Sequence, residues 1–82
     1  MTDFSLITGS AGLLGDQHAI ALAEKKYNLI LVDIDKKKLM SQTKKIKIRF
    51  PGLKVLFFVC DITDEYQIIK TKKELLKQKI SL

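Results

Sequence analysis

Three short apolar runs divide the chain and predict three β-strands, at residues 4–8, 29–33 and 54–60. None of these runs alternates apolar with polar residues, as a strand with one solvated face would. Strands that are apolar on both faces are typical of a parallel sheet covered by helices on either side. The runs therefore predict the interior sheet of an α/β protein.

Longer stretches with helical periodicity separate and follow the strands, at about residues 13–26, 36–50 and 64–80. In the second stretch, the inward positions recur three to four residues apart and are Leu39, Thr43, Ile46 and Phe50. Asp35 is a suitable N-cap for this helix, and Pro51-Gly52 ends it. These signals predict three helices, one after each strand.

The other two helices differ in the strength of their apolar stripes. The first places on one face, which we expect to point inward, the residues Leu14, His18, Ala19, Leu22 and Ala23. The third has only a moderate stripe, formed by Ile68, Leu75, Leu76 and Lys79. All three helices are therefore expected to cover the sheet, the last one least well.

The predicted order is βαβαβα, which we expect to form half of a doubly wound Rossmann fold. Right-handed crossovers then give the parallel strand order 3-2-1. Residues 1–82 are expected to form a single half-domain. The first strand would keep one open edge, where a complete fold has a fourth strand, and open edges are a liability. We therefore expect a fragment of a longer protein, a truncated product or a subunit that needs a partner.

Composition and charge limit the class of protein. The 82 residues carry a formal net charge of +6, and Cys60 is the single cysteine, which excludes a disulfide framework within the chain. The longest apolar run, residues 55–60, is far shorter than the ~20 residues that span a bilayer. Asp3 stands where a signal peptide would carry positive charge. A soluble cytoplasmic protein is expected.

Thirteen of the 15 basic residues lie between Lys36 and Lys79. They suggest either a nucleic-acid partner or a solvated lysine face on two helices. Only one of them is arginine, and no aromatic residues are interleaved with the lysines to stack on bases. The solvated face is the favoured interpretation, and no nucleic-acid partner is expected.

The turn after the first strand carries glycines at Gly9, Gly12 and Gly15, between a predicted strand and a predicted helix. Glycine permits a positive φ in a tight turn and a close approach of the backbone to a phosphate. The first N–H groups of the following helix favour an anion. The motif predicts a site for the diphosphate of a dinucleotide, and a glycine-rich turn without a ligand is the alternative.

Two acidic positions extend this prediction. Asp33 ends the second strand, where a carboxylate can accept both hydroxyls of an adenosine ribose and repels a 2′-phosphate. NAD is therefore predicted rather than NADP, although Lys36, Lys37 and Lys38 lie close by in the sequence. A capping or solvated acid is the alternative role for Asp33.

The pair Asp61-Ile62 follows the third strand at the same edge of the sheet. Asp61 can accept a hydrogen bond from an adenine amino group, and Ile62 can pack on the ring. Asp61 is equally suitable as the N-cap of the last helix. The sequence leaves these two roles open.

Three segments together resemble the short-chain dehydrogenase/reductase family, and specifically its N-terminal cofactor-binding portion. They are TGSAGLLG at residues 8–15, LVDID at 31–35 and CDITD at 60–64. The resemblance implies that Gly9, Gly12 and Gly15 hold the cofactor diphosphate. It also implies that Asp33 selects NAD and that Asp61 and Ile62 frame the adenine. The remaining candidate cofactor-binding residues, which flank these, are Ser10, Leu14 and Ile34.

The resemblance implies an oxidoreductase that transfers a hydride between nicotinamide and an alcohol or carbonyl substrate. The glycine spacing is also common in extended nucleotide-sugar epimerases and dehydratases, and the Gly-Leu-Leu-Gly form is similar to enzymes of surface-sugar and flagellin modification. A non-catalytic dinucleotide-binding module is a further alternative. The oligomeric state is open, and a homo-oligomer of the intact enzyme is compatible with the family.

No catalytic residue is expected within this chain. Tyr66 and Lys70 reproduce the Tyr-x-x-x-Lys spacing of the family, which pairs a phenol with an ammonium on one helical face. They follow the third strand, however, whereas the family's pair follows the fifth, so we interpret them as a surface pair. His18 and Cys60 are interpreted as structural, and no metal-ligand spacing is present.

Overall fold

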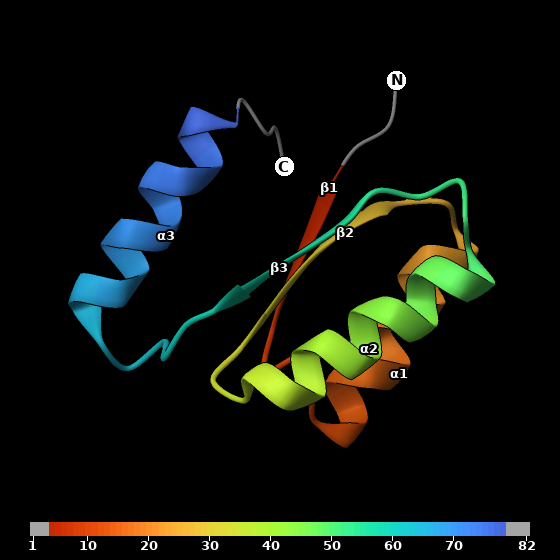
Figure 1. The fold of residues 1–82 in the computed structure, drawn as a ribbon, viewed down its shortest axis with the longest axis horizontal. Coiled ribbons are helices and arrows are strands. Elements are labelled where there is room, and N and C mark those ends of the chain that lie inside the picture. The colour runs from red at the N-terminus through yellow and green to blue at the C-terminus, as the bar shows by residue number, and fades with distance from the viewer. Residues whose placement is uncertain (1–3, 79–82) are drawn as a thin grey trace.

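The structure is a computed structural model that describes residues 4–78. Strands and helices alternate along the chain (Figure 1) as β1 Phe4–Thr8, α1 Leu13–Glu24, β2 Asn28–Asp33, α2 Lys36–Arg49, β3 Val55–Val59 and α3 Glu65–Lys77. The predicted βαβαβα order is confirmed, with boundaries that shift by at most a few residues. Residues 79 and 80, which we predicted to extend the last helix, lie outside the described residues.

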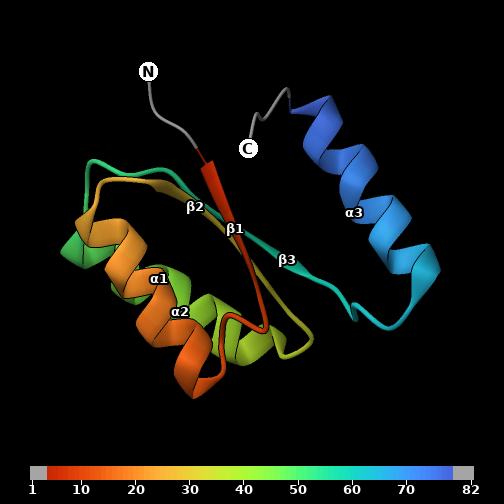
Figure 2. The ribbon, with the colours of Figure 1, turned by 180° about the vertical axis from the view of Figure 1, so that it is seen from behind.

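The three strands form one parallel sheet in the order β1-β2-β3, which confirms the predicted order 3-2-1. In the middle of the sheet, Ile30 of β2 stands opposite Leu6 of β1 and Leu56 of β3. Figures 1 and 2 show that α1 and α2 lie side by side on one face of the sheet and that α3 covers the other. This is the layering of a Rossmann-like half fold.

The face under α1 and α2 holds the larger core. Its buried residues come from all three strands and both helices and are Ile7, Ala19, Ala23, Leu29, Leu31, Leu39, Ile46 and Val55. Small residues let α1 approach the sheet closely, because its buried side chains are only Ala19 and Ala23. This face therefore gives the fold most of its apolar burial.

The face under α3 is packed more lightly. Its buried residues are Ile30, Val32 and Cys60, with Ile68 and Leu75 of α3 packed against them. α3 itself contains no fully buried residue. Ile68 and Leu75 of the predicted stripe face the sheet, but Leu76, which we also placed on it, is 75% exposed, so that part of the prediction was wrong. The helix therefore lies on the sheet with few apolar contacts.

The inward face predicted for the first helix was partly wrong. His18 is exposed, and Leu14 is 79% exposed. Leu14 and His18 each precede a small residue, Gly15 and Ala19. These small residues face inward in their place. Close packing of the helix against the strand selects the small side chains for the interface and turns the larger ones outward.

Candidate functional site

The carboxyl ends of the three strands surround a small pocket of about 150 Å³. Its lining residues come from the turn after β1, the end of β2 and the loop after β3, and they are Gly9, Asp33, Ile34, Cys60, Asp61 and Ile62. All of them except Cys60 were predicted as cofactor-binding residues from the sequence. The parallel topology brings these positions together from three separate stretches of chain.

Hydrogen bonds and one positive φ angle define the backbone conformation of the glycine turn. Gly9 adopts a positive φ of 62°, which lets the chain turn sharply as it leaves β1. The N–H of Gly12 then donates to the carbonyl of Gly9 at 3.2 Å, and the N–H of Ser10 donates to the carbonyl of Val32 in β2 at 3.1 Å. The turn is therefore held both within itself and against the neighbouring strand.

Gly15 lies where α1 crosses this turn. A Cβ atom at this position would collide with the carbonyl oxygen of Gly9 and lie 2.8 Å from the Cα of Ser10. Both neighbours are main-chain atoms and cannot move aside as a flexible side chain would. The third glycine of the motif is thus required for close packing of the helix on the turn.

The beginning of α1 carries no side-chain cap. Its N-cap residue is Gly12, whereas Asp35 caps α2 by accepting from the N–H of Lys38 at 3.1 Å. The first N–H groups of a helix have no partner within the helix. At α1 they are left for solvent or for a ligand, and the helix dipole favours an anion there.

Asp33 connects the end of β2 to the glycine turn. One carboxylate oxygen accepts from the N–H of Ala11 at 3.0 Å, and the other accepts from the N–H of Asp35 at 3.0 Å. The carboxylate is half-buried at the rim of the pocket. It does not cap α2, because Asp35 does, so the capping alternative for Asp33 was wrong.

Asp61 faces the same pocket from the loop after β3. Its carboxylate accepts from the hydroxyl of Thr63 at 2.6 Å and from the N–H of Thr63 at 2.9 Å. These hydrogen bonds hold the pKa of Asp61 below its usual value. α3 is capped by Asp64, so the role of Asp61 as N-cap, left open by the sequence, was also wrong.

Ser10 and Leu14 occupy contrasting places beside the turn. Ser10 is fully buried, and its hydroxyl has no hydrogen-bond partner among the described residues. Leu14 extends into solvent from the first turn of α1. The Ser10 side chain therefore lies beneath the surface of the turn, while Leu14 presents an apolar side chain beside it.

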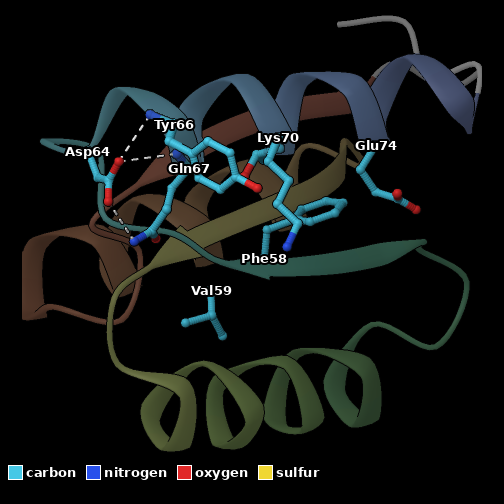
Figure 3. A pocket seen from close by; sticks show the side chains of 8 residues that line it. Phe58, Val59, Asp64, Tyr66, Gln67, Lys70 and Glu74 are labelled. Carbon is cyan, nitrogen blue, oxygen red and sulfur yellow. Dashed lines mark hydrogen bonds between the residues drawn. The ribbon is translucent and has the colours of Figure 1, made fainter.

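A larger pocket of about 460 Å³ lies between β3 and α3, away from the glycine turn (Figure 3). Tyr66 and Lys70 extend from the same side of α3 over Phe58, as their spacing predicts. Tyr66 is 72% exposed, which agrees with the interpretation of the two as a surface pair. None of the predicted cofactor-binding residues lines this pocket.

The described part of the chain shows no group of three or more His, Cys, Asp or Glu residues that could hold a metal ion. In the same residues, no helix is both long enough and apolar enough to cross a membrane.

Sequence reasoning missed two residues that shape the site. Ala11 donates the N–H that joins the turn to Asp33, and Gln42 of α2 is buried against the turn from the other side. The contribution of Ala11 is a main-chain one and leaves no mark in residue type. Gln42 had a signal, since it is a polar residue one position before Thr43 of the inward stripe.

A parallel half fold with a glycine turn, an acid at the end of β2 and an acid after β3 defines the class of nucleotide-binding α/β proteins. The chain matches the family described as short chain dehydrogenase over residues 4–81. It therefore belongs to the short-chain dehydrogenase/reductase family, and the resemblance to the N-terminal portion of that family is confirmed. No curated protein matches the chain.

Solved structures show the same relationship. Levodione reductase is similar with 29% identity and a TM-score of 0.84 over 93% of this chain and 30% of the reductase. NAD⁺-bound xylitol dehydrogenase shows 26% identity and a TM-score of 0.84, covering 93% of this chain and 28% of the dehydrogenase. A short-chain dehydrogenase from Sphingobium yanoikuyae, in complex with NADPH, shows 25% identity and a TM-score of 0.80, covering 89% of this chain and 28% of the Sphingobium enzyme. The chain thus spans less than a third of the length of these structures.

Proposed function

We propose that this chain binds the adenosine diphosphate portion of NAD, as the cofactor-binding part of an oxidoreductase. The observation that carries this proposal is the convergence of five predicted residues on one pocket at the carboxyl edge of the sheet. In the intact protein the nicotinamide would exchange a hydride with an alcohol or carbonyl substrate. The family match favours this reaction over the epimerase, dehydratase and purely non-catalytic alternatives.

The residues present fit the parts of the cofactor in turn. The uncapped start of α1 offers main-chain N–H groups to the diphosphate, and the glycine turn lets the ligand approach the backbone closely. Two isoleucines flank the pocket and expose apolar surface, Ile34 at 65% and Ile62 at 53%. Exposed apolar side chains around a pocket suit a flat apolar ring such as adenine. Asp61, whose carboxylate also accepts two hydrogen bonds from Thr63, is an acceptor for the adenine amino group.

We propose NAD rather than NADP because Asp33 would meet the adenosine ribose. Each of its oxygens accepts one main-chain N–H and retains acceptor capacity for a ribose hydroxyl. A phosphate on the 2′-oxygen would bring a second negative charge against this carboxylate. Relatives of both kinds exist, since the xylitol dehydrogenase structure holds NAD⁺ and the Sphingobium structure holds NADPH.

We further propose that residues 1–82 act as one half-domain of a larger sheet. Within residues 4–78, β1 pairs only with β2, so its other edge is open. α3 runs back toward the end of the sheet at which the strands begin, as a crossover helix to a further parallel strand does (Figures 1 and 2). The proton-transfer residues of the reaction would then lie outside these 82 residues.

Four finer assignments complete this proposal. The Gly-Leu-Leu-Gly sequence at residues 12–15 supports the surface-sugar or flagellin-modification branch of the family. The single cysteine is consistent with a reducing compartment, and we place the protein in the cytoplasm. A small-molecule substrate and assembly of the intact enzyme into a homo-oligomer are proposed from the family alone.

Calorimetric titration of the chain with NAD and NADP tests the assignment. NAD is expected to bind more tightly, and Asp33→Ala should weaken NAD binding by about tenfold or more, since it removes ribose hydrogen bonds to a charged acceptor. Glu24→Ala is the matched control, because Glu24 is an exposed acid at the far end of α1. Asp33→Asn keeps one acceptor oxygen but removes the negative charge, so it should reduce the difference in binding affinity between NAD and NADP. Equal binding of both cofactors by the unmodified chain would refute the choice of NAD, and binding of neither would refute the function.

A further inference from the structure

Gln42 is a buried polar residue in the middle of α2, only 4% exposed. Its side-chain nitrogen donates two hydrogen bonds to segments far away in the sequence. One reaches the main-chain carbonyl of Ser10 in the glycine turn at 2.7 Å, and the other reaches a carboxylate oxygen of Asp16 at 2.9 Å. A single amide group therefore joins α2, the glycine turn and the first turn of α1.

The chemistry of the partners determines how this amide is oriented. A carbonyl and a carboxylate can only accept hydrogen bonds, so the NH₂ group of Gln42 must face them. Its oxygen is consequently buried without a partner among the described residues. An unsatisfied buried oxygen is unfavourable. An apolar residue of similar size would avoid that cost but would remove the donor from the Ser10 carbonyl on the glycine turn and from the Asp16 carboxylate on α1.

The hydrogen bonds meet the turn where its main chain is most constrained. The N–H of Ser10 is bonded to β2, and the next N–H, from Ala11, is bonded to Asp33. The carbonyl of Ser10 is the group that Gln42 holds from the opposite side. Ser10 is thus held from both sides, by β2 and by α2, and the path of the chain from Ser10 into α1 depends on both.

Asp16 extends this arrangement to the helix. It lies in the first turn of α1, and its second oxygen is 3.8 Å from the ammonium nitrogen of Lys45 on α2. The Lys45 side chain is mostly exposed, so this ion pair contributes little to stability. The hydrogen bond from buried Gln42 is the stronger link, and it holds the turn against the start of α1, where the uncapped N–H groups are open to a ligand.

We infer that Gln42 is a positioning residue for the phosphate cradle: it holds the glycine turn and the start of α1 in the arrangement that receives a diphosphate. This inference rests on the proposed function, because it assigns the turn a diphosphate ligand. Gln42 would not touch the cofactor. Its removal should weaken recognition of the diphosphate and leave recognition of the adenosine end unchanged.

The test compares Gln42→Leu with Thr43→Val in the 82-residue chain. Thr43 is the next residue of α2, is equally buried, and has a hydroxyl without a partner, so its loss should be nearly neutral. ADP and adenosine are titrated against each variant, because ADP reaches the turn and adenosine occupies only the strand-end pocket. Hydrogen exchange of the Ala11 and Gly12 amides, compared with that of Ile30 in the central strand, is followed without ligand.

Gln42→Leu is expected to weaken ADP binding by about tenfold, to change adenosine binding by less than about twofold, and to speed exchange at Ala11 and Gly12 alone. Thr43→Val should alter none of these. If Gln42→Leu does not fold, Gln42→Met, which is closer in length and equally unable to donate, takes its place.

Unchanged exchange at the turn in a folded Gln42 variant would overturn the inference. Parallel loss of ADP and adenosine binding, or faster exchange at Ile30 as well, would also overturn it, because either result indicates a general structural role. If the unmodified chain binds neither ADP nor NAD, the proposed function fails. The exchange measurement then still decides separately whether Gln42 holds the turn.

Discussion

The two faces of the sheet differ in how firmly they hold the two ends of the candidate site. The glycine turn and α1 belong to the face where two helices bury residues from every strand. The loop with Asp61 leads into α3, which has no fully buried residue and rests on a small cluster. The proposed diphosphate end is therefore rigidly supported, whereas the proposed adenine end depends on hydrogen bonds within its own loop.

The largest effect should separate the two faces by their contribution to folding. Leu31 is fully buried under α1 and α2, and Leu31→Ala is expected to lower the free energy of unfolding by about 2–5 kcal/mol. Leu75 on α3 is only partly buried, and Leu75→Ala should cost about 1 kcal/mol. Urea unfolding followed by circular dichroism measures both values. Equal decreases in the free energy of unfolding would show that the two faces contribute equally to stability.

The second prediction concerns the close packing of α1 on the turn. Gly15→Ala places a methyl group against main-chain atoms and should cost about 1–3 kcal/mol of stability and abolish measurable NAD binding. Gly52→Ala is the matched control, because a Cβ at Gly52 meets nothing within 4 Å. Thermal unfolding and calorimetric titration report the two effects. A Gly15→Ala variant with unchanged stability would contradict the packing argument.

The third prediction addresses the lightly packed helix. Asp64 accepts from the N–H groups of Tyr66 and Gln67 at the start of α3, and Asp64→Ala should cost about 1 kcal/mol. Because α3 has little burial to hold it, the loss should be confined to this helix and be visible as faster amide exchange along it. Asp35→Ala removes the corresponding cap of α2 and is the comparison. The amide exchange rate in the well-packed α2 should rise less than that in α3. A larger rise in α2 would contradict the view that the face under α1 and α2 is the more firmly packed one.

The smallest effect is expected at Asp61. Thr63 lowers the pKa of Asp61 in the folded state, so the folded protein favours the ionised carboxylate. The associated stability is present above the ordinary aspartate pKa, about 3.9, and is lost as the pH falls through the lower folded value. Thr63→Val should shift the pKa of Asp61 upward, as followed by NMR titration of the carboxyl carbon. An unchanged pKa in that variant would show that the hydroxyl is not its cause.

The comparison of the two faces also shows where reasoning from sequence succeeded and where it failed. The strands were predictable because unbroken apolar runs such as residues 29–32 have few alternatives in a chain of this length. Their common edge followed from parallel topology, and with it the approach of Asp33 to the pocket. The caps were only partly predictable, because Asp61 and Asp64 are both good capping residues and only the chain path selects Asp64.

The order of elements, the parallel sheet and the positions that gather at its carboxyl edge all follow from the amino-acid sequence alone. These depend on residue type and spacing, which act locally along the chain. Three features became apparent only in the folded chain: Leu14 faces solvent, Asp33 accepts from the N–H of Ala11, and Gln42 is buried beneath the turn. Each of these features depends on how closely α1 and α2 pack against the strands. That packing brings together residues 22 to 32 positions apart in the chain, so local residue type and spacing do not predict it.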